Sequence, residues 1–191
     1  QAGSGQGQYG EGMGDVMSVL LLDSPELGFG FYGDCGSSLR DADNTLQYPC
    51  SGGIHECGQL LSGSVWDLRE ELVSVYPDGY IDTVANLAIN AMLVHTGDLI
   101  TPQITIDYLT LDDDDANLEN GSPNWEYICA AFGAHSMDCP ELLPVAFTYP
   151  DGIPEFIAPN AQQLVRVEVS GLAGTPSSGT AQLFYSLNGA P

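Results

Sequence analysis

Residues 55–76 read HECGQLLSGSVWDLREELVSVY and carry a helical pattern. Apolar residues recur in it three or four positions apart, as expected for one buried face of a helix. They are Leu60, Leu61, Val65, Leu68, Leu72 and Val73. Pro77-Asp78-Gly79 follows and predicts where the helix ends. The segment therefore predicts a long helix with one face in the protein core.

Further helical patterns precede and follow this segment. They cover residues 11–23, 82–95, 101–111 and 122–137. Asp82 is a candidate cap, and Pro102 suits the first turn of a helix. Residues 24–54 are rich in glycine and predict a long ordered loop. The fold class is therefore mainly α, with one helical domain over residues 1–143.

The pattern changes after Pro140, where three strand-like segments are joined by Pro, Gly and Ser. They cover residues 145–149, 163–169 and 181–187. Three strands do not close a sandwich. Residues 144–191 therefore predict a partial, immunoglobulin-like β module, or an appendage completed by another chain.

The charge of the chain restricts its partners. Three Arg, no Lys and 26 acidic residues give a formal net charge of −23, so nucleic acid and anionic lipid would be repelled. No stretch approaches the roughly 18 apolar residues of a membrane span. An acidic surface is common in secreted or salt-adapted proteins, and its carboxylates are ligands suited to calcium. The run Asp112-Asp113-Asp114 predicts a calcium site, with a solvated acidic turn as the alternative.

Five cysteines allow two disulfides and leave one thiol over. Cys129 and Cys139 flank a predicted helix end and are expected to pair. The second pair comes from Cys35, Cys50 and Cys57, and we take Cys35 and Cys50 as disulfide cysteines. Together with the sequon at residues 120–122, the cysteines predict a secreted, extracellular protein. The first residues carry no signal peptide, so the N-terminus is expected to be a cut.

Candidate chemistry begins in the first predicted helix. Glu11 and Asp15 are four residues apart and share one helix face, so one could bind a metal and the other could orient a ligand. The alternative is a structural role, because acidic side chains near the start of a helix interact favourably with the helix dipole. His95 and His135 lie near predicted helix ends, where a dipole or surface role is expected.

The segment Gly10-Glu11-Gly12-Met13-Gly14-Asp15 resembles the Glu-x-x-x-Asp helix of fungalysin-like and thermolysin-like zinc peptidases. The resemblance implies that Glu11 is a zinc ligand and that Asp15 orients a zinc-bound histidine. Leu39 and Arg40 match the next family element, in which the arginine binds a substrate carbonyl and the leucine lines the substrate pocket.

The resemblance continues downstream in the family's order. His55, preceded by Gly52-Gly53-Ile54, matches the histidine that donates a hydrogen bond to the tetrahedral oxyanion. Trp66-Asp67-Leu68 follows at the family's spacing, and residues 124–132 resemble its closing helix. The resemblance thus implies the C-terminal helical subdomain of a thermolysin-like peptidase.

The H-E-x-x-H helix, which supplies two zinc ligands and the general base, does not occur in this sequence. The family places it just upstream of the Glu-x-x-x-Asp helix. We therefore expect a fragment of a secreted zinc endopeptidase that is inactive alone. It would bind zinc only with the missing N-terminal catalytic segment, and its substrate would be a peptide with a hydrophobic residue on the amine side. The alternative is a non-catalytic extracellular assembly protein, a homo-oligomer or fibre joined through the β edge at residues 181–187.

Overall fold

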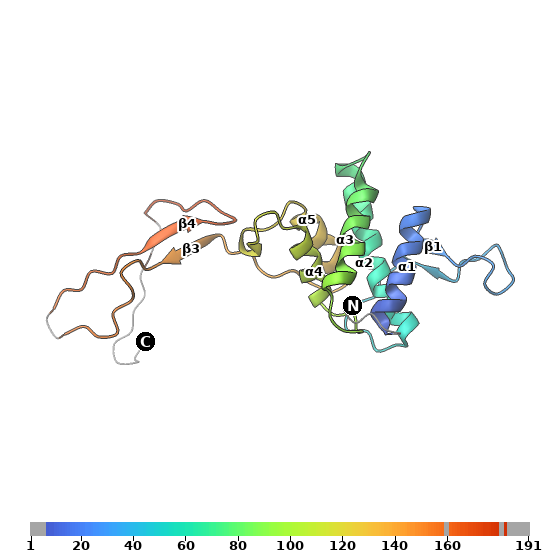
Figure 1. The fold of residues 1–191 in the computed structure, drawn as a ribbon, viewed down its shortest axis with the longest axis horizontal. Coiled ribbons are helices and arrows are strands. Elements are labelled where there is room, and N and C mark those ends of the chain that lie inside the picture. The colour runs from blue at the N-terminus through green and yellow to red at the C-terminus, as the bar shows by residue number, and fades with distance from the viewer. Residues whose placement is uncertain (1–6, 159–160, 180–181, 183–191) are drawn as a thin grey trace. The chain divides into compact units, whose positions relative to one another are not determined.

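The computed structural model describes residues 7–158, 161–179 and 182, and the chain forms two compact units, Gln1–Glu141 and Leu142–Pro191 (Figure 1). The first unit is built of helices, and the described part of the second holds one small sheet. The prediction of a mainly α protein is therefore confirmed. An immunoglobulin-like module is not observed in the described residues, and the third predicted strand lies outside them except for residue 182.

The helical unit is organised around one central helix, α2, which packs against α1, α3 and α5. Helix α4 contacts both α3 and α5. The helices are α1 (Gln8–Leu22), α2 (Ile54–Val75), α3 (Tyr80–Val94), α4 (Gln103–Asp112) and α5 (Trp125–Gly133), with a 3-10 turn, η1, at Leu118–Asn120. In the described part of the chain, no helix is both long enough and apolar enough to cross a bilayer.

The apolar stripe predicted for α2 forms the centre of the core. Leu60, Leu61, Val65, Leu68 and Leu72 are all fully buried, because α2 has helices on several sides. Val73, the sixth member of the predicted stripe, is only partly buried. Burial of about five large aliphatic side chains is worth roughly 1.5–3 kcal/mol for each, so α2 contributes much of the driving force for folding.

Helices α1 and α2 approach closely through two glycines. A Cβ on Gly12 would lie 2.7 Å from the carbonyl oxygen of Gly58, and a Cβ on Gly58 would lie 2.9 Å from the backbone nitrogen of Gly12. Only hydrogen fits at either position. The contact therefore sets the distance between the two helices that carry Glu11 and His55.

The long loop before α2 is ordered, as predicted, and it contains a short antiparallel ladder of β1 (Glu26–Leu27) and β2 (Arg40–Asp41). The backbone N–H of Leu39 donates to the carbonyl of Leu27 at 2.8 Å and extends this ladder. Further along, the Asn44 side-chain amide donates to the carbonyl of Gln59 in α2 at 3.2 Å. These bonds hold the loop against the helices and fix the position of Arg40.

Two disulfides close loops in the helical unit. Cys129–Cys139 is present as predicted. The assignment of Cys35 to a disulfide was wrong: Cys50 pairs with Cys57, and Cys35 is free and exposed. The physical reason is that Cys57 lies on the first turn of α2, 5.6 Å from Cys50 between Cα atoms, whereas Cys35 lies on the exposed loop between β1 and β2. Two disulfides are typical of extracellular proteins.

The second unit contains an antiparallel pair, β3 (Val145–Thr148) and β4 (Glu168–Gly171). Strand β3 agrees with the sequence pattern. Strand β4 begins later than the predicted 163–169 segment, because the pairing that places Phe147 opposite Val169 runs on to Gly171 opposite Val145. Residues 163–167 lie outside the ladder. The bounds of β4 are therefore set by its pairing with β3 and not by the alternation of apolar and polar residues in its sequence.

His135 joins three parts of the helical unit. It lies just past α5 with 1% of its surface exposed, and its Nδ1–H donates to the carbonyl of Leu46 at 2.6 Å. Its Nε2 lies 3.3 Å from an Asp67 carboxylate oxygen, an ion-pair distance without hydrogen-bond alignment. A Cβ on Gly63 would lie 2.7 Å from the ring, so glycine is needed there. Of the expected dipole or surface role, the surface role was wrong, because the ring is buried beside Asp67.

The contacts of His135 predict a pH dependence of stability. Burial alone would lower its pKa, but the Asp67 carboxylate and the Leu46 carbonyl outweigh burial and raise the pKa above the ordinary 6.5. A histidine whose folded pKa is raised stabilises fully below its unfolded pKa and loses that contribution as the pH rises through the folded pKa. As the pH rises above about 6.5, the wild-type urea midpoint should therefore decrease relative to that of His135→Gln.

The comparison with His135→Gln isolates the contribution of this histidine, because the rest of the chain is the same in both proteins. Asp67→Asn is the matched variant, because it removes the carboxylate and keeps the imidazole. It should flatten the same pH profile. Urea unfolding followed by circular dichroism from pH 5.5 to 8.5 measures both, and a wild-type midpoint that rises relative to His135→Gln over this range would contradict the prediction.

Candidate active site

Four residues predicted from the sequence meet at the crossing of α1 and α2. Glu11 and Asp15 lie on the same face of α1, His55 lies on the first turn of α2, and Arg40 comes from β2. They form two pairs, His55 with Glu11 and Arg40 with Asp15. Gly12 lies between Glu11 and Asp15 on α1, and Gly58 lies three residues after His55 on α2. Their contact brings α1 close enough to α2 for the His55–Glu11 pair to form.

The His55–Glu11 pair is open to solvent. Nδ1 of His55 lies 2.7 Å from Oε2 of Glu11, and the side chains are 60% and 31% exposed. With Nδ1–H donating to the carboxylate, Nε2 of the neutral ring is an acceptor, and in the imidazolium form Nε2–H is a second donor. The exposed ring can therefore accept a proton or donate one to a bound molecule while Glu11 holds its orientation.

The Arg40–Asp15 pair is more buried. Nη1 of Arg40 donates to Oδ1 of Asp15 at 2.6 Å, and the side chains are 19% and 9% exposed. Burial raises the pKa of Asp15 above its ordinary 3.8, and the Arg40 guanidinium opposes that rise without cancelling it. Oδ2 of Asp15 is buried and has no hydrogen-bond partner. A buried oxygen without a hydrogen-bond donor destabilises the folded state. Oδ2 of Asp15 is therefore suited to accept from a further N–H or O–H group.

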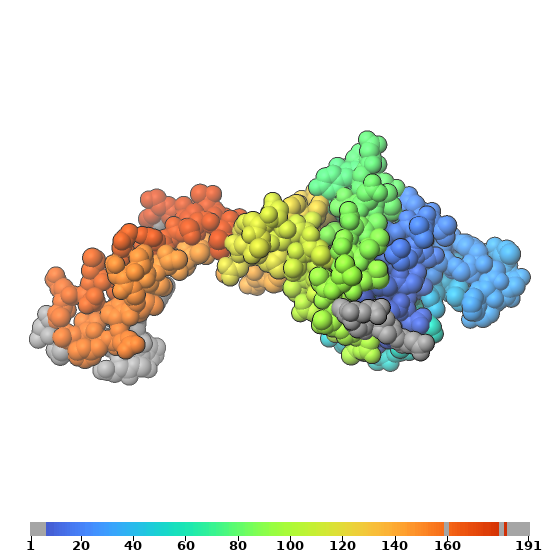
Figure 2. Space-filling view, viewed as in Figure 1, coloured from blue at the N-terminus to red at the C-terminus, as the bar shows by residue number. Residues whose placement is uncertain are grey.

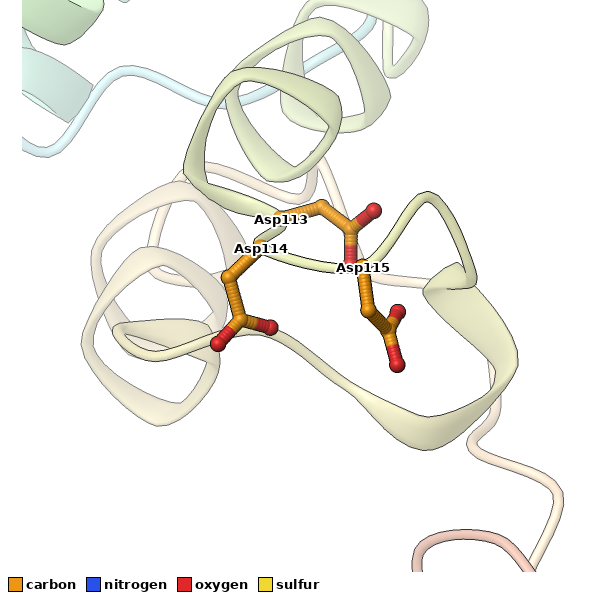
Figure 3. Close-up of side chains that lie close together, drawn as sticks. All are labelled: Asp113, Asp114 and Asp115. Carbon is orange, nitrogen blue, oxygen red and sulfur yellow. The ribbon is translucent and has the colours of Figure 1, made fainter.

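Of these four residues, Glu11 could bind a metal through the carboxylate oxygen that does not pair with His55, and the four form no complete ligand set. Among the described residues, three ligand groups converge only at Asp113, Asp114 and Asp115 (Figure 3). Glu11 suits a zinc ion that has other ligands, and the partnerless Oδ2 of Asp15 suits the ring N–H of a ligating histidine. The residues present therefore fit part of a zinc site, and two or more ligands would come from elsewhere.

The acidic cluster differs from the predicted one by one residue. Asp112 is not available to a cation, because its carboxylate accepts from the Ser122 hydroxyl and from the backbone and side-chain N–H groups of Asn124, each at 2.6 Å. It fixes the start of α5. Asp114 and Asp115 are exposed, and Figure 3 shows them close to Asp113 in the loop after α4. Calcium binding here stays a prediction.

The sequence did not indicate the surroundings of His95. Its ring is 3% exposed, stacks on Tyr9 with a centroid distance of 4.1 Å, and pairs through Nδ1 with Asp107 at 2.8 Å. The expected surface role was wrong here too, because α1 and α4 cover the ring. Burial is the main cause that raises the pKa of Tyr9, so its phenol stays neutral.

The partner of Asp67 and the close glycine contact were also not predicted from the sequence. Trp66-Asp67-Leu68 was matched to the family by its spacing from His55, and in the structure Asp67 pairs with His135. Spacing along α2 shows which residues share a face but not which distant residue they meet. The glycines at positions 12 and 58 were a usable signal, because a glycine inside a helix indicates a close backbone approach.

Comparison with models of protein families, with curated proteins and with solved structures finds no match to this chain. The four residues of the site and their surroundings are therefore the features that indicate a function.

Proposed function

We propose that this chain forms part of the active site of a secreted zinc-dependent endopeptidase resembling fungalysin. The observation that carries the proposal is the meeting of Glu11, Asp15, Arg40 and His55 at one crossing, with Glu11 2.7 Å from His55 and Arg40 2.6 Å from Asp15. The partnerless buried oxygen of Asp15 supports it further, because a donor from another segment would satisfy this atom. The two disulfides agree with an extracellular location.

Each residue of the candidate site has a role in this proposal. Zinc, when bound by Glu11 and by histidines of a further segment, would polarise the peptide carbonyl and activate water. His55, as an imidazolium, donates from Nε2 to the negative charge that develops on the carbonyl oxygen. Asp15 accepts from a ligating histidine and fixes its tautomer. Arg40, held by Asp15 and partly exposed, donates to a substrate carbonyl, and Leu39 contacts the hydrophobic residue on the amine side.

The experiment uses the chain together with the segment that supplies the other zinc ligands, because the chain alone is expected to be inactive. The substrate is a quenched fluorescent peptide that has leucine on the amine side of the scissile bond. His55→Ala should lower kcat by about 100-fold to 1,000-fold with little change in KM, because it removes one donor to the oxyanion. Glu56→Gln, the next residue on the same turn, is the matched control and should keep wild-type activity. Zinc per chain and inhibition by a chelator are measured in parallel, and chelator-resistant hydrolysis would disprove the mechanism.

A second function is favoured by the β unit. Within the described residues, strands β3 and β4 form a sheet of two strands, and Phe147 and Val169 on it are 55% and 39% exposed. Such a sheet supports the alternative of an extracellular assembly protein, in which a neighbouring chain completes a partial immunoglobulin-like module. Light scattering at rising protein and salt concentration tests this, since salt screens the net charge of −23. A strictly monomeric protein would count against assembly.

A further inference from the structure

An exposed aromatic loop extends from the site toward solvent. Residues 28–39, here named the aromatic arm, connect β1 to β2 and carry Phe29, Phe31 and Tyr32, which are 50%, 67% and 83% exposed. In Figure 2 the arm stands out from the helices of its unit. Large aromatic side chains held in water have a free-energy cost that monomeric proteins usually avoid, and clusters of them mark interaction sites.

The arm is built to hold these rings in place. The backbone N–H of Gly30 donates to the carbonyl of Asp34 at 3.1 Å, and the Asp34 carboxylate accepts from the Gly36 N–H and from the Ser37 hydroxyl. Gly28, Gly30 and Gly33 all have φ between 73° and 82°, a region that favours glycine. The Phe31 and Tyr32 rings contact edge to face at 5.0 Å. The loop thus presents a preformed aromatic surface.

Apart from Arg40, which pairs with Asp15, the charged side chains on the arm and beside its base are negative. Glu26, Asp34, Asp41 and Asp43 are exposed on the arm or beside its base. The three cations of the chain are already paired: Arg40 with Asp15, Arg69 with Asp23 and Glu70, and Arg166 with Glu168. None of these three arginines is therefore left unpaired to neutralise the carboxylates or to cover the rings of the arm.

We propose that the aromatic arm is the docking surface for a positively charged segment of another polypeptide. Guanidinium and ammonium groups bind the faces of aromatic rings, and the neighbouring carboxylates complement their charge. A net charge of −23 attracts such a segment from a distance and repels nucleic acid and anionic lipid. The arm leads directly into Leu39 and Arg40, so a docked chain would lie next to the candidate site. The inference goes beyond peptide hydrolysis and does not depend on it.

The test is the binding of a fluorescein-labelled oligo-arginine peptide to the full chain, measured by fluorescence anisotropy. All proteins carry Cys35→Ser, which prevents cross-linking through the exposed thiol. The double variant Phe31→Ser/Tyr32→Ser should bind about tenfold more weakly than the parent. The matched control, Leu21→Ser/Leu22→Ser, removes two side chains that are 78% and 66% exposed at the end of α1 and should bind as the parent does.

Both double variants keep the net charge, so long-range attraction is the same in all three proteins. Equal affinity of the parent and the arm variant would overturn the proposal, since bulk charge would then explain binding. A citrulline peptide of the same length should bind far more weakly, and equal binding would mean an apolar occupant. Light scattering detects a second copy as the occupant, and a dimer that the arm variant abolishes would also overturn the proposal.

Discussion

Gly12→Ala is expected to lower the free energy of unfolding by about 1–3 kcal/mol, the usual cost of overpacking. The new Cβ would lie 2.7 Å from the carbonyl oxygen of Gly58 and 3.0 Å from the Cβ of Leu61. The first of these atoms belongs to the backbone of α2, so it cannot rotate away. Helices α1 and α2 must move apart, and the 2.7 Å pair between Glu11 and His55 should be lost with them.

Gly14→Ala is the matched control, two residues further along the same helix. Gly14 is exposed, and a Cβ there has no neighbour within 4 Å. Alanine should therefore stabilise the protein by up to about 1 kcal/mol through its higher helix propensity. Urea unfolding followed by circular dichroism gives both values. If the two variants shifted the midpoint in the same direction by similar amounts, the close contact of the helices would be disproved.

Arg40→Met is expected to destabilise the protein by about 3–5 kcal/mol at neutral pH, because it leaves a buried carboxylate without its partner. The Asp15 side chain is 9% exposed, and Arg40 is its hydrogen-bond donor at 2.6 Å. The loss is a large share of the roughly 5–15 kcal/mol that stabilises a typical domain. The double variant Asp15→Asn/Arg40→Met removes the unpaired charge, so it should recover much of the lost stability.

The effect of Arg40→Met should shrink at acidic pH. The folded pKa of Asp15 already lies above 3.8 because of burial, and loss of the Arg40 guanidinium raises it further. A carboxyl with a raised folded pKa binds more protons in the folded state, so stability increases as the pH falls from that pKa toward about 3.8. Unfolding midpoints between pH 4 and 8 measure this, and a defect independent of pH would contradict it.

Arg166→Met is the control for this series. Arg166 also pairs with a carboxylate, that of Glu168, but the two side chains are 58% and 53% exposed. Exposed ion pairs contribute little, because water already solvates both charges. No measurable change in stability is expected. A loss as large as that of Arg40→Met would mean that burial is not what makes the Arg40 pair important.

The helices could be predicted from the sequence because their signal is local. Leu60, Leu61, Val65, Leu68 and Leu72 repeat with the period of a helix, and all five are buried. Helix ends were less accurate, since α3 begins at Tyr80, before the predicted cap Asp82. The Cys129–Cys139 pair was also predictable, because its two cysteines are separated by one short helix end.

The contacts that build the candidate site depend on packing and have no local signal. The order of Glu11, Asp15, Arg40 and His55 along the chain suggested their roles, but their pairing requires α1, α2 and β2 to meet. The Cys50–Cys57 disulfide, the His135–Asp67 pair and the orientation of His95 toward Asp107 have the same origin. Periodicity states which face of a helix is buried. Which residues meet across that face depends on the distance and angle between helices, and here the Gly12–Gly58 contact sets that distance for α1 and α2.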